Sequence, residues 1–249
     1  MTLDVLASGS SGNCYLLQND NECLVIECGI PFKTVKQALG FNILKIAGVI
    51  GSHVHADHMG HAEEYLKCGI PVYASEETLK MPSIRKYENT VIMRVGFWHQ
   101  IGGFNVTPFR VEHDVECYGF IIRHEDFGTL LFATDTCFVK DNFKSLAVNH
   151  ILVECNYSQS IIDSRVANGE TIQGLRDRVL KSHMELQTTK DFVSKNKTPM
   201  LDSVLLLHLS SGNSDAEEFQ RAIQGVVGEK VKVRVADKGL SYLLNICPF

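Results

Sequence analysis

The sequence lacks the features of membrane-spanning, secreted and disulfide-stabilised proteins. No apolar run approaches the about 20 residues that a helix needs to cross a bilayer. The N-terminal stretch MTLDVLASGSSGN has neither a basic segment nor a long apolar one. The eight cysteines are scattered without any C-x-x-C pair, which fits neither a disulfide framework nor a cysteine zinc site. We therefore expect reduced thiols packed in the core, a cytoplasmic location and no membrane partner.

Positive charge is also scarce in this chain. There are 24 Lys and Arg against 29 Asp and Glu, which gives a formal net charge of −5. This balance argues against a generally basic nucleic-acid-binding protein, but it allows a local basic face or metal ions that supply positive charge at a site. The densest basic stretch, residues 165–197, also carries acidic residues. Such a mixture is more typical of a solvated helix face than of a binding surface.

Short apolar runs typical of buried strands recur along the chain, and helix-period segments lie between some of them. We expect strands at 2–7, 14–18, 23–28, 47–52, 71–75, 91–96, 104–113, 118–124, 129–135, 150–156, 203–210 and 232–237, and helices at 30–41, 60–69, 171–184, 185–196 and 215–228. A polar hairpin turn is expected at residues 18–21. Two strand-rich halves followed by helices predict an α/β fold of two packed sheets with helices outside. No linker-like stretch separates the halves, so we predict a single domain over residues 1–249.

The stretch SHVHADHMGH at residues 52–61 holds four of the chain's ten histidines. It follows a predicted buried strand, and the loops at the carboxyl ends of strands converge in open sheets. His53 and His55 can aim at one point from an extended backbone, while Asp57 and His58 can aim at a neighbouring point. Imidazole and carboxylate are the usual ligands of catalytic zinc or manganese. The pattern H-x-H-x-D-H therefore indicates a metal centre rather than a solvated loop.

Further ligand-capable residues stand at the ends of later predicted strands. His113, Asp135 and His208 each follow an apolar run. A lone histidine in such a place is usually structural, but three such residues together with the first cluster favour a shared metal site. We predict all three as metal ligands.

These motifs resemble the metallo-β-lactamase superfamily, whose signature H-x-H-x-D-H appears here at residues 53–58. The later single-ligand motifs match in order and spacing, so the resemblance covers nearly the whole chain. It implies a four-layer αβ/βα sandwich with a dinuclear site at one edge, which would hold two divalent ions, zinc or manganese. The resemblance assigns the first ion to His53, His55 and His113, the second to Asp57, His58 and His208, and a bridging position to Asp135.

Two further stretches distinguish branches of this superfamily. A histidine directly after the motif's aspartate, as in His58, is typical of phosphodiesterases and thioesterases rather than of true β-lactamases. Residues 152–158 and 182–192 resemble the phosphodiesterase branch, which includes tRNase Z. This implies that Glu154 and His183 assist proton delivery to the leaving oxygen. The alternatives are a helix-cap histidine and a glutamate that merely orients a metal ligand.

A narrower similarity is carried by LASGSSGNCYLL, FATDTCFV, LVECN and HLSSGN. These stretches are similar to the YycJ/WalJ group of small proteins regarded as DNA exonucleases. The glycines of SGSSGN allow close backbone approach, and its hydroxyl and N–H groups can hold a phosphate, although a plain β-turn would use the same residues. The predicted substrate-binding residues are Ser8, Ser10, Ser11, Asn13, Ser210 and Asn213. Two stretches depart from the family pattern: Glu27-Cys28-Gly29 replaces Asp-x-Gly, and residues 159–182 are individual.

The resemblance implies two-metal hydrolysis, in which a hydroxide bridging the metals attacks phosphorus. The predicted catalytic residues are Asp57, His183 and Glu154. We predict a 5′→3′ DNA exonuclease that takes nucleic acid, DNA rather than RNA, as its substrate. The alternatives are a phosphodiesterase for cyclic nucleotides, an RNase of the tRNase Z type, a thioesterase, and a metal-binding scaffold without turnover.

Overall fold

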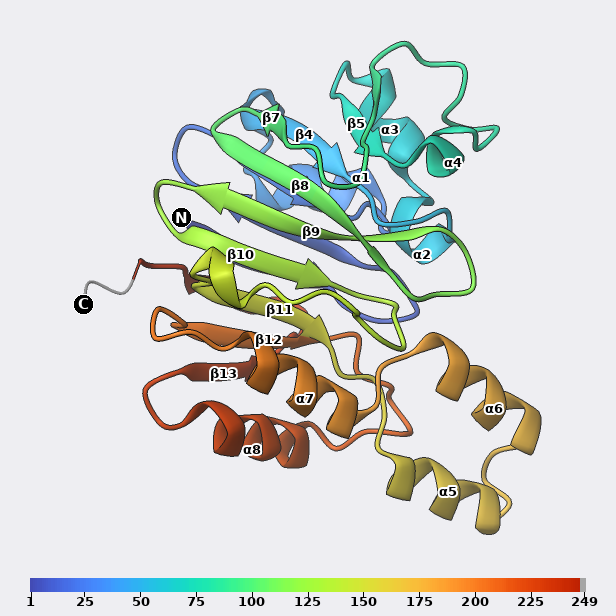
Figure 1. Ribbon diagram of the computed structural model, residues 1–249. Coiled ribbons are helices and arrows are strands. Elements are labelled where there is room, and N and C mark those ends of the chain that lie inside the picture. Colours follow the sequence, from blue (N-terminus) through green and yellow to red (C-terminus); the bar gives the residue numbers. More distant parts are fainter. Residues whose placement is uncertain (247–249) are drawn as a thin grey trace.

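The computed structural model describes residues 1–246, and the strands of this part of the chain form two seven-stranded sheets (Figure 1). The first sheet has the order β14 (Ser241–Leu243), β1 (Thr2–Ala7), β2 (Cys14–Gln18), β3 (Cys23–Ile26), β4 (Ile46–Ile50), β5 (Val72–Ala74) and β6 (Thr90–Ile92). The second has the order β13 (Lys232–Val235), β12 (Ser203–Leu207), β11 (His150–Glu154), β10 (Gly128–Ala133), β9 (Cys117–His124), β8 (Phe104–Val111) and β7 (His99–Ile101). In each sheet an edge strand, β14 or β13, comes from the last twenty residues of the chain.

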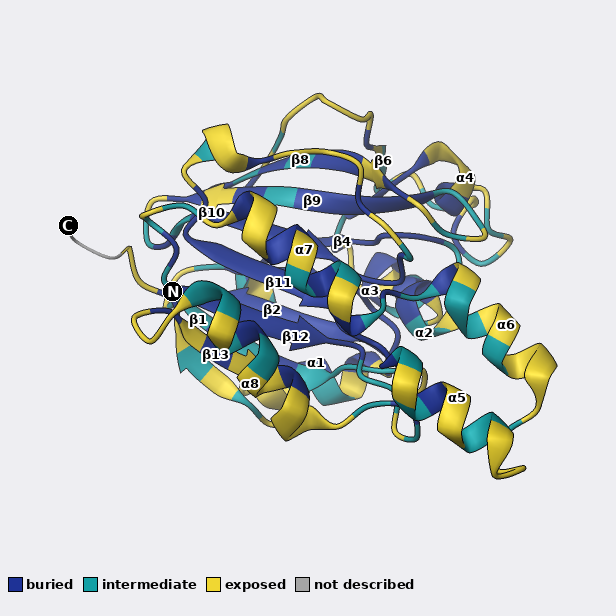
Figure 2. Cartoon of the chain, turned by 60° about the horizontal axis from the view of Figure 1, so that its bottom comes forward, coloured by how far each residue is buried: buried dark blue, intermediate teal, exposed yellow. Residues whose placement is uncertain are grey.

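Helices connect and cover these strands. They are α1 (Phe32–Ala38), α2 (Ala56–Met59), α3 (Ala62–Lys67), α4 (Glu76–Leu79), α5 (Gln159–Ala167), α6 (Gln173–Ser182), α7 (Leu186–Asn196) and α8 (Ala216–Val227), with short 3₁₀ turns at Ile43–Lys45 and Lys144–Leu146. In the described part of the chain, none of the helices has the length and apolar character needed to cross a membrane. Figure 2 shows that α5 and α6 project from the body and are exposed or half-buried over most of their surface.

Three buried apolar clusters give the molecule four layers. The central cluster lies between the sheets and contains side chains of both, such as Leu17 and Phe132. A second cluster joins the outer face of the first sheet to α1 and α3, with Tyr65 fully buried. A third joins the second sheet to α7 and α8, through residues such as Phe192 and Phe219. Burial of apolar side chains from water on both faces of both sheets holds these layers together. The predicted αβ/βα sandwich is confirmed.

Both sheets bring the carboxyl ends of parallel strands to one edge. The strands β3 to β6 are parallel, and so are β10 to β13. The strand β8 runs in the same direction as β10, because both pair antiparallel with β9. Parallel strands are buried on both faces, and all five residues of β12, SVLLL, are buried. The segments that follow β4, β8, β10 and β12 carry the predicted metal ligands.

Some local expectations were shifted or incomplete. The hairpin turn predicted at 18–21 lies one residue later, because Gln18 still pairs with Cys23 and the N–H of Asn19 donates to the carbonyl of Glu22 over 3.0 Å. The helix α5 was not predicted, since Ile162 is its single buried residue and it presents no apolar stripe. The short strands β7 and β14 were also missed, because three residues carry too little of the alternating pattern.

The cysteines follow the core prediction in part. All seven within the described residues are free thiols. The prediction of core packing is confirmed for the buried ones, Cys14, Cys23, Cys28, Cys117 and Cys155. It is wrong for Cys68, which is exposed where α3 ends, and for Cys137, which is half-buried in the loop after β10. Cys247 lies outside the described residues.

Candidate metal centre

Three imidazoles converge at the end of β4. The Nε2 atom of His53 lies 2.9 Å from Nδ1 of His55, and Nε2 of His113 lies 3.4 Å from the same Nδ1 atom. Potential ligand atoms of these three residues all lie within 4.8 Å of one another. Burial, together with the neighbouring His58, lowers the pKa of His53 far below its usual range. His53 therefore stays neutral and keeps a lone pair for a cation.

A second group surrounds the carboxylate of Asp135. Its Oδ1 lies 3.3 Å from Nε2 of His58 and 3.2 Å from Nδ1 of His208. The Oδ2 atom of Asp57 lies 3.5 Å from the same Nε2 atom of His58. Asp135 belongs to groups of potential ligands with His53 and His58 and with His183 and His208. Asp135 therefore contacts candidates from both predicted ligand sets, while Asp57 belongs to none of these groups.

The backbone at this edge is unusual in two of the ligand positions. Asp135 and His208 have φ values of 47° and 53°, in the left-handed region that side chains other than glycine rarely adopt. Such conformations cost about 1 kcal/mol or more and persist where surrounding structure fixes them. Asp135 comes just after the buried strand β10, and His208 directly follows the buried strand β12. The strained turns aim both side chains back toward the shared edge.

The carboxylate of Asp135 and the imidazoles around it shift each other's pKa values. Burial opposes ionisation of Asp135, but the positive charges of His58 and His208 outweigh it and hold the pKa of this carboxyl well below its usual range. Burial likewise opposes protonation of His58, but the carboxylates of Asp135 and Glu27 raise its pKa well above the ordinary value. A buried carboxylate that stays ionised requires compensating positive charge. Asp135 thus provides a fixed negative charge among several imidazoles.

The donor set fits divalent cations. The Nε2 atom of His208 is buried and has no hydrogen-bond partner within residues 1–246, and leaving such an atom unsatisfied costs about 1–3 kcal/mol. The surrounding donors are imidazole nitrogens and carboxylate oxygens, which suit zinc or manganese at catalytic sites. The thiol of Cys117 lies 3.6 Å from Nδ1 of His53. Burial raises its pKa well above the usual value, so it stays protonated and is a poor ligand.

Glu154 and His183 form a hydrogen-bonded pair beside these ligands. The Nδ1 atom of His183 donates to Oε1 of Glu154 over 2.6 Å. The same oxygen lies 3.1 Å from Nδ1 of His208, and Oε2 accepts from the backbone N–H groups of Thr136 and Met184. Burial opposes protonation of His183, but the charge of Glu154 outweighs it and raises the pKa to about 8. His183 is also the C-cap residue of α6, so its position at the helix end does not separate the helix-cap alternative from the predicted role in proton delivery.

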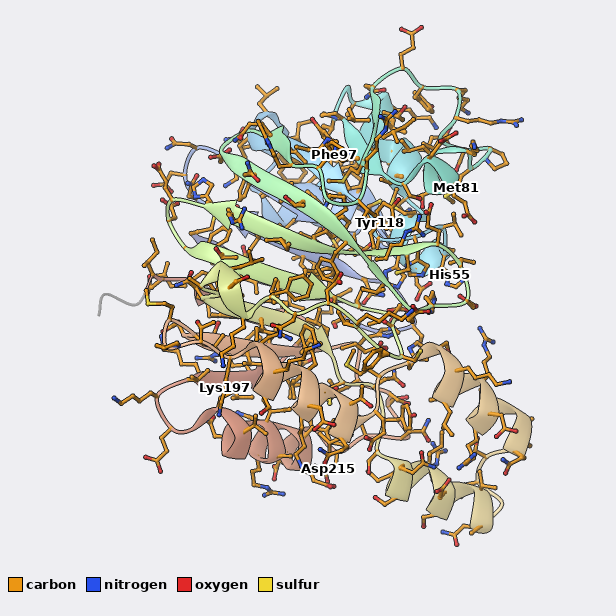
Figure 3. All side chains as sticks on the ribbon, viewed as in Figure 1. His55, Met81, Phe97, Tyr118, Lys197 and Asp215 are labelled. Carbon is orange, nitrogen blue, oxygen red and sulfur yellow. The ribbon has the colours of Figure 1, made fainter. Side chains whose placement is uncertain are left out.

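Two adjoining cavities open at this edge. The smaller, of about 340 Å³, is lined by ligand candidates such as His55, Asp57 and Asp135. The larger, of about 620 Å³, lies between α6 and the two loops that contain the sequence Ser-Ser-Gly-Asn, at residues 10–13 and 210–213. The cavities share the residues Ser10, Arg178, Ser182, His183 and His208. Figure 3 shows His55 at the edge of the sandwich, on the side where α6 lies.

The comparisons with known proteins agree with this geometry. Residues 7–147, more than half of the chain, match the family model described as the metallo-beta-lactamase superfamily. The chain belongs to this superfamily. Exodeoxyribonuclease YycJ of Bacillus anthracis is 28% identical over 243 residues, which cover 91% of this chain and 89% of the relative. Exodeoxyribonuclease WalJ of Streptococcus pneumoniae serotype 2 is 26% identical over 228 residues, which cover 86% and 83%.

A solved structure extends the likeness to the whole fold. The metallo-beta-lactamase fold protein YhfI from Bacillus subtilis superposes with a TM-score of 0.73 at 18% identity, covering 97% of this chain and 98% of the other. The predicted superfamily and the similarity to the YycJ/WalJ group are confirmed. The chain is accordingly a metallo-β-lactamase superfamily hydrolase with nuclease relatives at modest identity.

Glu27 replaces the aspartate that the superfamily commonly has before the metal-binding loop. Its carboxylate is buried and accepts from the N–H of Ser52 over 3.3 and 3.4 Å. It also lies 3.5 Å from Nδ1 of His58, while the hydroxyl of Ser52 lies 2.8 Å from Nδ1 of His53. The backbone of Glu27 adopts a φ of 63°. The longer side chain therefore still supports the loop and fixes the ring nitrogens that face away from the centre.

Gly29 is the tightest point of this support. A Cβ atom there would lie 1.7 Å from the carbonyl oxygen of Asp57 and 2.9 Å from the backbone nitrogen of Asn13. Gly29→Ala must therefore displace the turn that carries Asp57 and His58. We expect the free energy of unfolding to fall by about 1–3 kcal/mol. We also expect metal affinity to fall about 10–100-fold, which is the usual effect of disturbing groups that orient metal ligands. Thermal unfolding and metal titration against a chelator measure the two effects.

Gly225→Ala is the matched control for this substitution. Gly225 lies in α8, and a Cβ atom there meets nothing within 4 Å. Alanine at this position should leave metal affinity unchanged and raise stability by up to about 1 kcal/mol through helix propensity. A Gly29→Ala protein with the parent's metal affinity and unfolding temperature would contradict the assigned role.

The predicted substrate-binding residues divide into two kinds. Ser10 and Ser11 are exposed and line the larger cavity. Ser210, which is half-buried, and Asn213, which is buried, line it from the opposite loop. Ser8 also lines it, but its hydroxyl accepts from Tyr15 over 2.8 Å and from the N–H of His208 over 3.0 Å. These four loop residues and Ser8 therefore border one space.

Asn13 lies deeper than the other loop residues. It is fully buried, and its amide nitrogen lies 3.3 Å from the carbonyl of Asp57 and 3.1 Å from Nε2 of His58. Its amide oxygen accepts from the N–H of Gly9 over 2.9 Å. These bonds let Asn13 hold the first loop against the metal-binding turn.

Sequence reasoning missed Asp114, and it counted Arg178 only among the basic residues of 165–197 that could form a face for DNA or a solvated helix face. Asp114 lies 3.0 Å from Nε2 of His113 and 3.6 Å from Nε2 of His55; its position next to His113 was the available signal. Arg178 lines both cavities from α6. Nothing in the local sequence distinguishes it from the other basic residues of 165–197.

Proposed function

We propose that this hydrolase cleaves phosphodiester bonds in DNA as a 5′→3′ exonuclease dependent on two divalent ions. The observation that carries the proposal is the His183–Glu154 pair, bonded over 2.6 Å at the wall of the cavity that also contains the ligand candidates. A proton donor beside a cation site suits departure of a poor alkoxide leaving group. The names of the relatives YycJ and WalJ, both exodeoxyribonucleases, support DNA as the substrate. The direction is carried over from the resemblance to their group.

The proposal assigns the ions to the residues that the resemblance implies. His53, His55 and His113 would hold the first ion, Asp57, His58 and His208 the second, and Asp135 would contact both. When bound, the two ions supply an activated water and offset negative charge on the phosphate. Asp57 is both a ligand and the residue whose turn is fixed by Asn13 and Gly29.

The remaining steps are carried by the protein's own side chains. Glu154 occupies Nδ1 of His183, which leaves Nε2 to face the substrate. With a pKa of about 8, His183 carries a proton at neutral pH and transfers it to the leaving 3′ oxygen. Glu154 fixes the ring and stabilises its charged form, as orienting carboxylates do in other acid–base pairs. Ser10, Ser11 and the second loop would hold the chain of the substrate nearby.

A substrate panel tests this proposal. The full-length protein, loaded with Mn²⁺ or Zn²⁺, is incubated with 5′-labelled duplex DNA, single-stranded DNA, RNA and cyclic mononucleotides. We expect mononucleotides from the 5′ end of DNA, faster than from RNA, with loss of activity in chelator and recovery on metal return. Hydrolysis of cyclic nucleotides alone would select the small-substrate phosphodiesterase. No cleavage by folded, metal-loaded protein would overturn the proposal in favour of a scaffold.

A further inference from the structure

The larger cavity extends the candidate metal centre in one direction. It begins at His183 and His208, which also border the metal cavity, and continues between the two Ser-Ser-Gly-Asn loops to α6. Its volume of about 620 Å³ lies within the range of sites that bind small organic molecules. Of the predicted metal ligands, His208 alone lines this cavity.

The walls of this cavity have two chemical characters. Leu175, Val179 and Leu209 contribute apolar surface, and Leu175 is 47% exposed although it is a large apolar side chain. The loops contribute the hydroxyls of Ser10, Ser11, Ser210 and Ser211. A nucleoside has the matching character, because its base offers apolar faces while its sugar and base edges form hydrogen bonds.

Arg178 stands where the two cavities join. It is exposed on α6 and lines both spaces. Its neighbours in the helical hairpin are paired: Arg165 with Glu170 over 3.3 Å and Arg176 with Asp163 over 2.6 Å. Within residues 1–246 no carboxylate forms an ion pair with Arg178. A guanidinium left free beside a candidate phosphate site is suited to contact phosphate oxygens.

The helical hairpin α5–α6 is fixed against the second loop. Arg165 of α5 donates from Nη1 to the side-chain oxygen of Asn213 over 3.1 Å. A Cβ atom at Gly212 would lie 2.0 Å from the same Nη1 atom, so the loop glycine makes room for this contact. The segment 159–182, which departs from the family pattern, thereby supplies Leu175, Val179 and Arg178 to the wall of the cavity.

We propose that the larger cavity is a subsite for the nucleotide on the leaving-group side of the scissile phosphate. Leu175, Val179 and Leu209 contact its base, and Arg178 contacts a phosphate oxygen. This inference rests on the proposed function, in which His183 protonates the leaving oxygen. Because His183 borders both cavities, the departing nucleotide lies on the side of the larger one. The hairpin α5–α6 is then a substrate-binding element and not only a solvated extension.

Charge reversal at two exposed positions tests the subsite by kinetics. Leu175→Glu and Arg178→Glu place negative charge in the cavity without disturbing buried groups. The readout is the ratio of kcat/KM for a single-stranded oligonucleotide to kcat/KM for bis(p-nitrophenyl) phosphate, which has no nucleoside. We expect each substitution to lower this ratio by at least about tenfold, the loss of one such contact.

Matched controls come from the same hairpin. Ile172 is 74% exposed and Lys181 is exposed on α6, and neither lines the two cavities. Ile172→Glu and Lys181→Glu make the same charge changes and should leave the ratio within about twofold. A parent-like ratio in Leu175→Glu and Arg178→Glu, or an equal loss in the controls, would overturn the subsite while leaving the proposed hydrolysis intact.

A binding measurement separates this inference from the proposed function. Calorimetry with the metal-loaded protein compares deoxyadenosine 5′-monophosphate with inorganic phosphate. We expect Leu175→Glu to weaken nucleotide binding at least about tenfold and phosphate binding much less, since phosphate reports on the metal cavity. If the parent hydrolyses neither substrate, the proposed function fails, and the calorimetric difference still decides the subsite. Equal effects on both probes would overturn it.

Discussion

Asp135→Asn is expected to lower hydrolysis of DNA by at least about a thousandfold, because it removes the charge at the centre of the candidate metal site. Oδ1 of Asp135 lies 3.3 Å from a ring nitrogen of His58 and 3.2 Å from one of His208. Asparagine keeps the size of the side chain but loses the negative charge and half of its acceptor capacity. We therefore also expect metal content below that of the parent, measured by elemental analysis after dialysis, with DNA hydrolysis followed on a labelled duplex.

Asp141→Asn provides the control for this substitution. Asp141 follows in the same loop region, is exposed, and forms no ion pair within the described part of the chain. The same chemical change there should leave both activity and metal content as in the parent. If Asp135→Asn retained more than about a tenth of the activity with a full metal complement, the central position of this carboxylate would be refuted.

His183→Gln is expected to lower kcat for DNA by about 10²–10⁴-fold while metal content stays at the parent's level. Glutamine can still hydrogen-bond to Glu154 but cannot carry the proton that the raised pKa of His183, about 8, keeps available at neutral pH. The loss should shrink for an ester with p-nitrophenol as leaving group, because p-nitrophenolate departs without a proton. If His183 served only as a helix cap, His183→Gln would lower kcat for both substrates by the same factor. That result would exclude proton transfer by His183.

The partner Glu154 should share this effect. Because His183 donates to Glu154 over 2.6 Å, the two act as one unit in proton transfer. At saturating metal, removing both should therefore lower kcat little more than removing His183 alone. The comparison needs kcat for Glu154→Gln, His183→Gln and the double variant. Glu154 also lies 3.1 Å from Nδ1 of His208. We therefore expect Glu154→Gln to bind metal more weakly than the parent, whereas His183→Gln should bind metal as the parent does. Additive losses would show that the residues work separately.

The ligand candidates could be predicted because each stands in a regular position. His53, His113, Asp135 and His208 follow apolar runs that are long enough to be recognised as strands. Parallel strands bring their carboxyl ends to one edge, so residues far apart in sequence become neighbours without further information. The metal cluster and the layers of the fold therefore follow from pattern and from the superfamily resemblance.

The outer parts of the site depended on contacts that no local pattern records. Arg178 and Leu175 reach the cavities because α5 is fastened by Arg165 to Asn213, a contact across nearly fifty residues. Asn13 reads as a turn residue, yet it is buried with its amide near His58. Glu27 reads as a departure from the family, yet its φ of 63° lets the longer side chain reach Ser52. Tertiary packing decided each of these.

The division of the ligand candidates between the sheets has a consequence for biosynthesis. His53, His55, Asp57 and His58 follow β4 of the first sheet, whereas His113, Asp135 and His208 follow strands of the second. Neither sheet supplies a full set for even one ion as the resemblance assigns them. Synthesis must therefore pass His208, and the two sheets must pack together, before the centre that the resemblance implies could bind both ions.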